Sequence, residues 1–141
     1  MLLRIVILAF SLAGLVIALY FTFAYYGRVK KSRWVPAILC AREGSSCVTV
    51  VETPYARVFG VPNSLLGIFY YVALIGWVAA GSMLQTAWLG WALIAASVVA
   101  VLLGCYLVYA LRRILRMDCP LCYTAHAINA VLLVLLILLA R

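Results

Sequence analysis

Four of the five cysteines fall into two pairs that differ in spacing and surroundings. Cys40 and Cys47 lie in a polar stretch, whereas Cys119 and Cys122 form a Cys-Pro-Leu-Cys motif at the start of an apolar stretch. Thiolates exchange with disulfides through mixed disulfides, so cysteines placed in this way can pass two electrons from one pair to the other. The arrangement suits a relay between a protein thiol outside a membrane and an apolar acceptor within it.

The Cys-Pro-Leu-Cys motif has the residue types of a helix start. Asp118 is suited to cap such a helix, and Pro120 fits its first turn. Cys119 and Cys122 are three residues apart, on one side of that helix, and the partial positive charge of a helix N-terminus favours a reactive thiolate. A structural zinc site is the alternative, but such sites usually repeat the Cys-x-x-Cys spacing, and the other pair here has six intervening residues.

The segment between Cys40 and Cys47 contains one glycine and two serines at positions 44–46. A flexible segment of this kind would let either sulfur reach another thiol during exchange. A static disulfide that closes the loop explains the pair equally well, so both interpretations stay open. Cys105 lies alone in an apolar stretch, and we expect it to be a packed small apolar residue.

The composition is that of an integral membrane protein. Hydrophobic residues make up 70% of the 141 positions and charged residues only 10%, far below their share in a soluble domain. A transmembrane helix takes about 20 residues, so four spans and their connections use nearly the whole chain. We therefore expect a single membrane domain over residues 1–141, with no fused thioredoxin-like domain.

The apolar stretches predict an all-α integral membrane fold, a bundle of four transmembrane helices. The expected spans are about 5–26, 64–84, 88–111 and 119–140. The first is too long for the apolar part of a cleaved signal peptide. The long connection between the first two spans carries Thr53 followed by Pro54, a pattern typical of a helix start. We expect a short lid helix there, from Pro54 to Phe59, over the mouth of the bundle.

The basic residues indicate an orientation, because Lys and Arg in short loops concentrate on the cytoplasmic side of a membrane. The first and third connections hold Arg28, Lys30, Lys31, Arg33, Arg42, Arg57, Arg112, Arg113 and Arg116. We therefore predict a multi-pass protein of the cell membrane whose cysteine-bearing loops face the cytoplasm. Binding to anionic lipid headgroups is another role that these charges would serve. No nucleic-acid partner is expected, since the basic residues lie at the membrane boundary and form no separate domain.

Taken together, the motifs resemble the vitamin K epoxide reductase family, in particular its prokaryotic members that couple disulfide formation to quinone reduction. The resemblance rests on the loop pair Cys40 and Cys47, Thr53 six residues later, Pro62-Asn63-Ser64, and Cys119-Pro120-Leu121-Cys122 followed by Ala127-Ile128-Asn129. It covers roughly Cys40 to the C-terminus. The order of the two pairs is unlike that of the unrelated bacterial quinone-linked disulfide oxidase, in which the Cys-x-x-Cys comes first.

The resemblance implies a path for electrons through four catalytic cysteines. A separate thioredoxin-fold partner attacks a disulfide between Cys40 and Cys47, Cys47 exchanges with Cys119, and Cys122 delivers electrons to a membrane quinone. Helical geometry agrees in one respect, because Cys122 is about one turn further into the apolar stretch than Cys119. The quinone would be a menaquinone, a ubiquinone or a vitamin K-like compound, with an epoxide as a second possible substrate and no metal cofactor.

The resemblance also implies residues that contact the quinone. Asn63 holds the position that the family uses for a hydrogen bond to a quinone oxygen, although capping of the second span would explain it equally well. His126 stands where many family members have Tyr and shares a helix face with Cys122 and Asn129, so it would bind the quinone, relay a proton or fill a buried polar contact. The predicted quinone-binding set is Asn63, His126, Thr53, Phe59 and Phe69. For the two phenylalanines, ordinary core packing is the alternative.

A transporter fits the sequence less well. Small multispan transporters place an ionisable residue within a span, and His126, near one end of the last span, is the one candidate.

Overall fold

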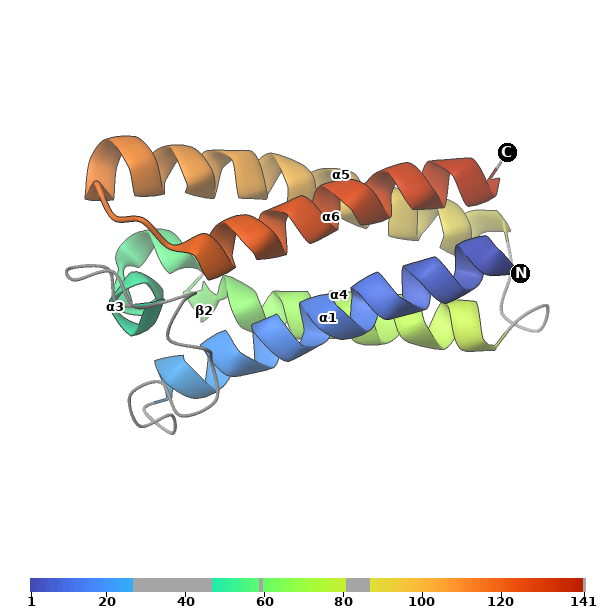
Figure 1. The fold of residues 1–141 in the computed structure, drawn as a ribbon, viewed down its shortest axis with the longest axis horizontal. Helices are drawn as coiled ribbons and strands as arrows, with labels where there is room; N and C mark the ends of the chain where they lie inside the picture. The colour runs from blue at the N-terminus through green and yellow to red at the C-terminus, as the bar shows by residue number, and fades with distance from the viewer. Residues whose placement is uncertain (27–46, 59, 81–86, 141) are drawn as a thin grey trace.

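The chain is mostly helical in the computed structural model, which describes residues 1–26, 47–58, 60–80 and 87–140 (Figure 1). The elements are α1 (Leu2–Tyr25), α3 (Cys47–Glu52), η1 (Pro54–Ala56), β1 (Arg57–Val58), β2 (Val61–Pro62), α4 (Asn63–Ala79), α5 (Ala87–Tyr109), η3 (Ala110–Leu115) and α6 (Pro120–Ala140).

Within this described part, three helical segments are long and apolar enough to cross a membrane: Leu2–Tyr25, Trp88–Leu115 and Pro120–Ala140. The prediction of a helical, multi-pass membrane protein is therefore confirmed. α4 is also apolar but has 17 residues, which gives about 26 Å of helix against roughly 30 Å for the hydrocarbon core of a bilayer. That α4 forms a fourth span stays a prediction.

The helix that contains the predicted span 88–111 continues beyond its apolar stretch. We expected the span to end near residue 111, but α5 passes into the π-helical turn η3, which includes the exposed Arg112 and Arg113. Hydropathy marks where the membrane ends, and charged residues do not by themselves end a helix. The helix stops at Arg116, whose backbone is left-handed with φ of 51°.

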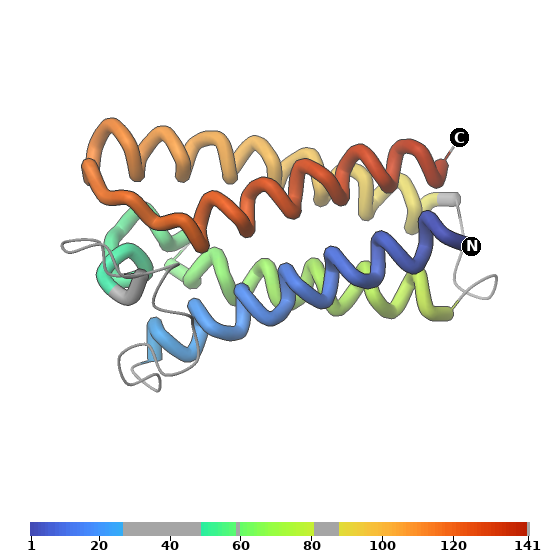
Figure 2. Tube along the Cα trace, in the orientation of Figure 1, coloured from blue at the N-terminus to red at the C-terminus, as the bar shows by residue number. Residues whose placement is uncertain are grey.

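The long helices form two closely packed pairs. α1 packs along α4, α5 packs along α6, and α1 also packs against α6, which joins the pairs (Figure 2). α4 and α5 make little direct contact. The short elements α3 and β2 lie at the end of the bundle where α6 begins, away from the N-terminal end of α1 (Figure 1).

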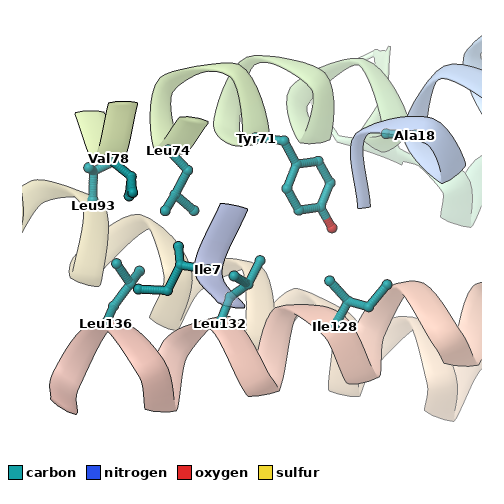
Figure 3. Packing of buried hydrophobic residues seen from close by; sticks show 9 residues of the cluster. All are labelled: Ile7, Ala18, Tyr71, Leu74, Val78, Leu93, Ile128, Leu132 and Leu136. Atoms are coloured by element: carbon teal, nitrogen blue, oxygen red, sulfur yellow. The ribbon is translucent and has the colours of Figure 1, made fainter. Parts of the chain in front are cut away.

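Two hydrophobic clusters hold the bundle together. In the first, side chains from α1, α4, α5 and α6 meet between the helices (Figure 3). Its members are Ile7, Ala18, Tyr71, Leu74, Val78, Leu93, Ile128, Leu132 and Leu136. The second cluster lies at the end where α6 begins and consists of Phe21, Ala24, Val50, Val51, Leu111, Cys119, Leu121 and Cys122. Packing in this second cluster thus sets the positions of Cys119 and Cys122.

The predicted lid helix from Pro54 to Phe59 is wrong beyond Ala56. The helical turn η1 ends there, Arg57 is extended with φ of −112° and ψ of 135°, and β1 pairs with β2 in a small antiparallel hairpin. Gly60 supplies the positive φ, 82°, that the turn of this hairpin requires. Phe59 itself lies outside the described residues. The helix α3 before η1 was not predicted.

Two of the expected helix caps also need correction here. Thr53 stands at the N-cap position of η1, but its hydroxyl donates a 2.7 Å hydrogen bond back to the carbonyl oxygen of Val50 in α3. Asn63 is the first residue of α4 and Pro62 takes the N-cap position, so capping does not explain Asn63. The side chain of Asn63 is therefore left for another role, whereas the hydroxyl of Thr53 holds the end of α3.

Candidate redox site at the mouth of the bundle

A disulfide between Cys119 and Cys122 lies at the start of α6, with the two Cα atoms 5.2 Å apart. Pro120 is the first residue of the helix, where its missing N–H costs nothing. The backbone N–H of Cys122 donates a 3.3 Å hydrogen bond to the sulfur of Cys119. Cys119 therefore takes the capping role that we expected of Asp118, whose carboxylate instead accepts a 3.4 Å hydrogen bond from the hydroxyl of Tyr123.

Both cysteines of the disulfide are shielded from solvent within a buried hydrophobic cluster. Cys119 is 1% exposed and Cys122 is 9% exposed, in the same cluster as Val50 and Val51 of α3. α3 begins at Cys47, one turn before these valines. The helix on which one loop cysteine lies thus belongs to the same buried cluster as the disulfide. Cys40 and the side chain of Cys47 lie outside the described part of the structure.

A cavity of about 550 Å³ opens beside the disulfide. α1, α3, α4, α5 and α6 all contribute to its walls, which are mainly apolar. The polar side chains on its wall belong to Thr53, Tyr55, Asn63, Ser64, Tyr70, Tyr71, His126 and Asn129. Its volume and its few polar groups in an apolar wall are typical of a site for a small organic ligand.

The cavity brings together several residues that are far apart in the sequence. Cys122, His126 and Asn129 line it from α6, as their shared helix face predicts, and Asn63 lines it from α4. Thr53 lines it from the segment between α3 and η1. Cys122 is the cysteine of the disulfide whose side chain reaches this cavity, whereas Cys119 is not among the lining residues.

Phe69 does not line the cavity, which corrects our expectation. Its side chain is 67% exposed on the outer surface of α4. Leu66 and Tyr70, one turn apart on α4, face the cavity instead, and Phe69 is rotated by about 100° from Tyr70. An outward phenylalanine suits a surface that faces lipid.

Hydrogen bonds between helices shape the cavity wall, and the sequence analysis did not identify Tyr71 or Ser97 as members of them. The hydroxyl of Tyr71 in α4 donates a 2.7 Å bond to the carboxamide oxygen of Asn129 in α6. The hydroxyls of Tyr70 and Ser97 lie 2.7 Å apart and link α4 to α5. In the sequence, Tyr71 stands out only by having a hydroxyl group within an apolar stretch. Tyr70 beside it has the same feature, so the sequence does not distinguish the two.

His126 lies one turn after Cys122 on α6 and lines the cavity. Its Nδ1 atom is buried and has no hydrogen-bond partner. Buried polar atoms of this kind are rare in folded proteins and often mark a functional site.

Taken together, an apolar helical bundle with a disulfide beside an apolar cavity defines a membrane protein of thiol–disulfide chemistry. Residues 5–137 match the model of the vitamin K epoxide reductase family. The chain belongs to this family, and it is accordingly a membrane thiol–disulfide oxidoreductase. A comparison with curated proteins returns no match.

Proposed function

We propose that the protein is a quinone-dependent, disulfide-generating oxidoreductase. It oxidises a thioredoxin-like partner and passes the electrons through Cys40 and Cys47, then through Cys119 and Cys122, to a membrane quinone. One observation carries the proposal: the disulfide has Cys122 on the wall of an apolar cavity, and both of its cysteines belong to the buried cluster that includes Val50 and Val51 of α3. The disulfide therefore lies beside a candidate ligand site, in the same cluster as the helix that begins at Cys47.

The first step transfers two electrons from the partner to the loop pair. The dithiol of the partner becomes a disulfide and loses two protons, and the Cys40–Cys47 disulfide becomes two thiols. The thiolate of Cys47 then attacks the sulfur of Cys119, which frees Cys122 as a thiolate at the cavity. Cys40 attacks Cys47 in turn and releases Cys119, so the loop disulfide is restored and the electron pair resides on Cys119 and Cys122.

The cavity suits the ring of a quinone in size and in polarity. About 550 Å³ is within the usual range for sites that enclose a small ligand. The apolar wall favours an apolar ring, and the side chains of Asn63 and His126 on that wall offer positions for hydrogen bonds. A menaquinone, a ubiquinone or a vitamin K-like quinone has the required chemistry.

Three side chains with nitrogen donors, Asn63, His126 and Asn129, lie on the cavity wall together with Cys122. Donors fixed in an apolar site stabilise negative charge on a carbonyl oxygen, because no water has to reorient around it. The hydrogen bond from Tyr71 holds the oxygen of Asn129, which leaves the amide N–H groups as donors. When bound, the quinone would supply the chemistry of accepting two electrons and two protons.

A structural zinc site made of four cysteines is the competing proposal. Zinc binds cysteine as the thiolate, and the sulfurs of Cys119 and Cys122 are joined to each other instead. Stoichiometric zinc in the purified protein, without thiol oxidation by quinone, would favour the competing proposal.

The decisive experiment measures quinone reduction by the purified protein with a small dithiol as reductant. We expect the native protein to be active and Cys122→Ala to be inactive with every reductant, because the electron pair cannot reach the cavity. Cys47→Ala should lose activity with a thioredoxin-like protein but regain part of it with a small dithiol, which can reduce Cys119 and Cys122 directly.

Cys105→Ala is the matched control, since Cys105 is a free cysteine on the exposed surface of α5. The expectation that Cys105 is a packed residue is therefore wrong. It should keep the activity of the native protein. Native protein that reduces no quinone, or Cys122→Ala that remains active, would refute the proposed function.

A further inference from the structure

Gly104 of α5 leaves the space that the ring of His126 occupies. A Cβ atom added at Gly104 would lie 2.8 Å from Nδ1 of His126 and 3.2 Å from its Cγ. Real Cβ atoms essentially never show a contact as short as the one to Nδ1, so the ring would have to move. His126, the one histidine in the chain, can take this position because Gly104 has no side chain.

The contact with Gly104 makes the two ring nitrogens of His126 unequal. Nδ1 faces the backbone of Gly104 and is buried without a hydrogen-bond partner. Nε2 is not among these buried atoms, and the side chain lines the cavity. The second nitrogen is therefore the one that a ligand can reach.

A neutral imidazole carries one proton, and the surroundings decide which nitrogen holds it. A proton on Nδ1 would be a buried donor with no acceptor. Without the proton, Nδ1 requires no acceptor in this buried position. The arrangement with the proton on Nε2 leaves the strong donor free to face the cavity.

From this contact we propose that Gly104 is a positioning residue that holds His126 as the Nε2–H tautomer. His126 then donates a hydrogen bond into the cavity and accepts none there. The site accordingly prefers a ligand that presents an acceptor, such as a carbonyl oxygen, to this position. The identity of that ligand as a quinone rests on the proposed function, but the tautomer does not.

The tautomer is measured directly by nitrogen NMR. Protein labelled with ¹⁵N-histidine and purified through a tag without histidine gives signals from one residue, because the chain has a single histidine. Full-length oxidised protein in lipid nanodiscs should show a protonated Nε2 and an unprotonated Nδ1. A protonated Nδ1 in the native protein overturns the inference, whatever the activity.

Replacement of Gly104 tests its action through His126. Gly104→Ala should raise the KM for a short-chain ubiquinone about tenfold, because the displaced ring loses its hydrogen bond to the ligand. The same replacement made in a His126→Ala protein should change the KM less than twofold, since no ring remains to be displaced. Equal effects in both backgrounds would contradict a role through His126.

Gly76→Ala is the matched control. It introduces the same methyl group into another apolar helix, where a Cβ at Gly76 meets no atom within 4 Å. The KM of Gly76→Ala for the short-chain ubiquinone and its ¹⁵N-histidine signals should equal those of the native protein. If the native protein shows the Nε2–H tautomer but reduces no quinone, the proposed function fails and the tautomer assignment of His126 stands.

Discussion

The sulfur of Cys119 accepts a 3.3 Å hydrogen bond from the backbone N–H of Cys122, and the two residues also share a disulfide. Cys119 therefore has two separate roles, as a redox partner of Cys122 and as the cap of α6. The two roles should respond differently to substitution, because the cap needs only an acceptor atom and the disulfide needs a sulfur.

Serine at position 119 should preserve the cap and alanine should remove it. Both variants should lose the disulfide and, with it, the proposed quinone reductase activity. We expect Cys119→Ala to unfold with a free energy about 1 kcal/mol lower than Cys119→Ser, since serine is among the best N-cap residues and alanine among the poor ones. Denaturant unfolding of the two purified variants measures this difference. Serine and alanine at position 122 form the control pair and should differ less, because the Cys122 sulfur is not the acceptor of that bond.

Loss of the Tyr71 hydroxyl should weaken the link between α4 and α6. Tyr71→Phe removes the 2.7 Å hydrogen bond to Asn129 and leaves a carboxamide oxygen without its donor. We expect a loss of about 1–3 kcal/mol in unfolding free energy, together with a raised KM for quinone. Tyr106→Phe, on the exposed side of α5, is the comparison. Identical stability of the two variants would show that the bond contributes nothing.

The close approach of α1 and α4 depends on Gly14. A Cβ at this position would lie 2.7 Å from the hydroxyl oxygen of Tyr71 and would overlap its ring. Gly14→Ala should therefore lower the free energy of unfolding by about 1–3 kcal/mol. This loss outweighs the stabilisation that alanine brings over glycine through its higher helix propensity. Thermal unfolding in detergent measures the effect, and combining Gly14→Ala with Tyr71→Ala should recover part of the loss.

The end of the bundle with the disulfide should face the cytoplasm. The described arginines at this end are Arg57, which lies over the ring of Tyr25, and Arg112, Arg113 and Arg116 at the end of η3. Basic residues in short loops stay on the cytoplasmic side. A variant with Cys40 as its single cysteine should resist a membrane-impermeant maleimide in intact cells and react after permeabilisation. Prompt labelling of intact cells would reverse the orientation.

A thioredoxin-fold partner should be trapped as a mixed disulfide. If the resolving cysteine of the partner is removed, the exchange stops after its first step and the covalent complex accumulates. We expect the link to form through Cys40 or Cys47 and to disappear on non-reducing gels when both are replaced. A link that survives their removal would show that the partner does not enter through the loop pair.

Helical periodicity was sufficient to place neighbours on one helix. Cys122, His126 and Asn129 share a face by spacing alone, and all three line the cavity. Pro120 begins α6 for a local reason of the same kind, a first turn that needs no N–H from it. Asp118 was a weaker inference, because the sulfur of Cys119 was available as a competing acceptor.

The inward face of each helix was beyond the reach of sequence reasoning. Phe69 and Tyr70 are adjacent and both aromatic, yet one faces outward and the other lines the cavity. In a soluble protein a polar stripe marks the outer face of a helix. Lipid is as apolar as the protein core, so a membrane helix lacks that stripe.

Composition and local spacing thus predicted the membrane class, the helical fold and the reactive cysteine motif, because hydropathy and the helical repeat are properties of neighbouring residues. The contact of Gly104 with His126 and the bond from Tyr71 to Asn129 join different helices, and only their packing brings these residues together. Packing also places Cys122 at the cavity and Cys119 away from it. Such contacts depend on how far the helices are rotated and how closely they approach, and no spacing along a single chain segment encodes that.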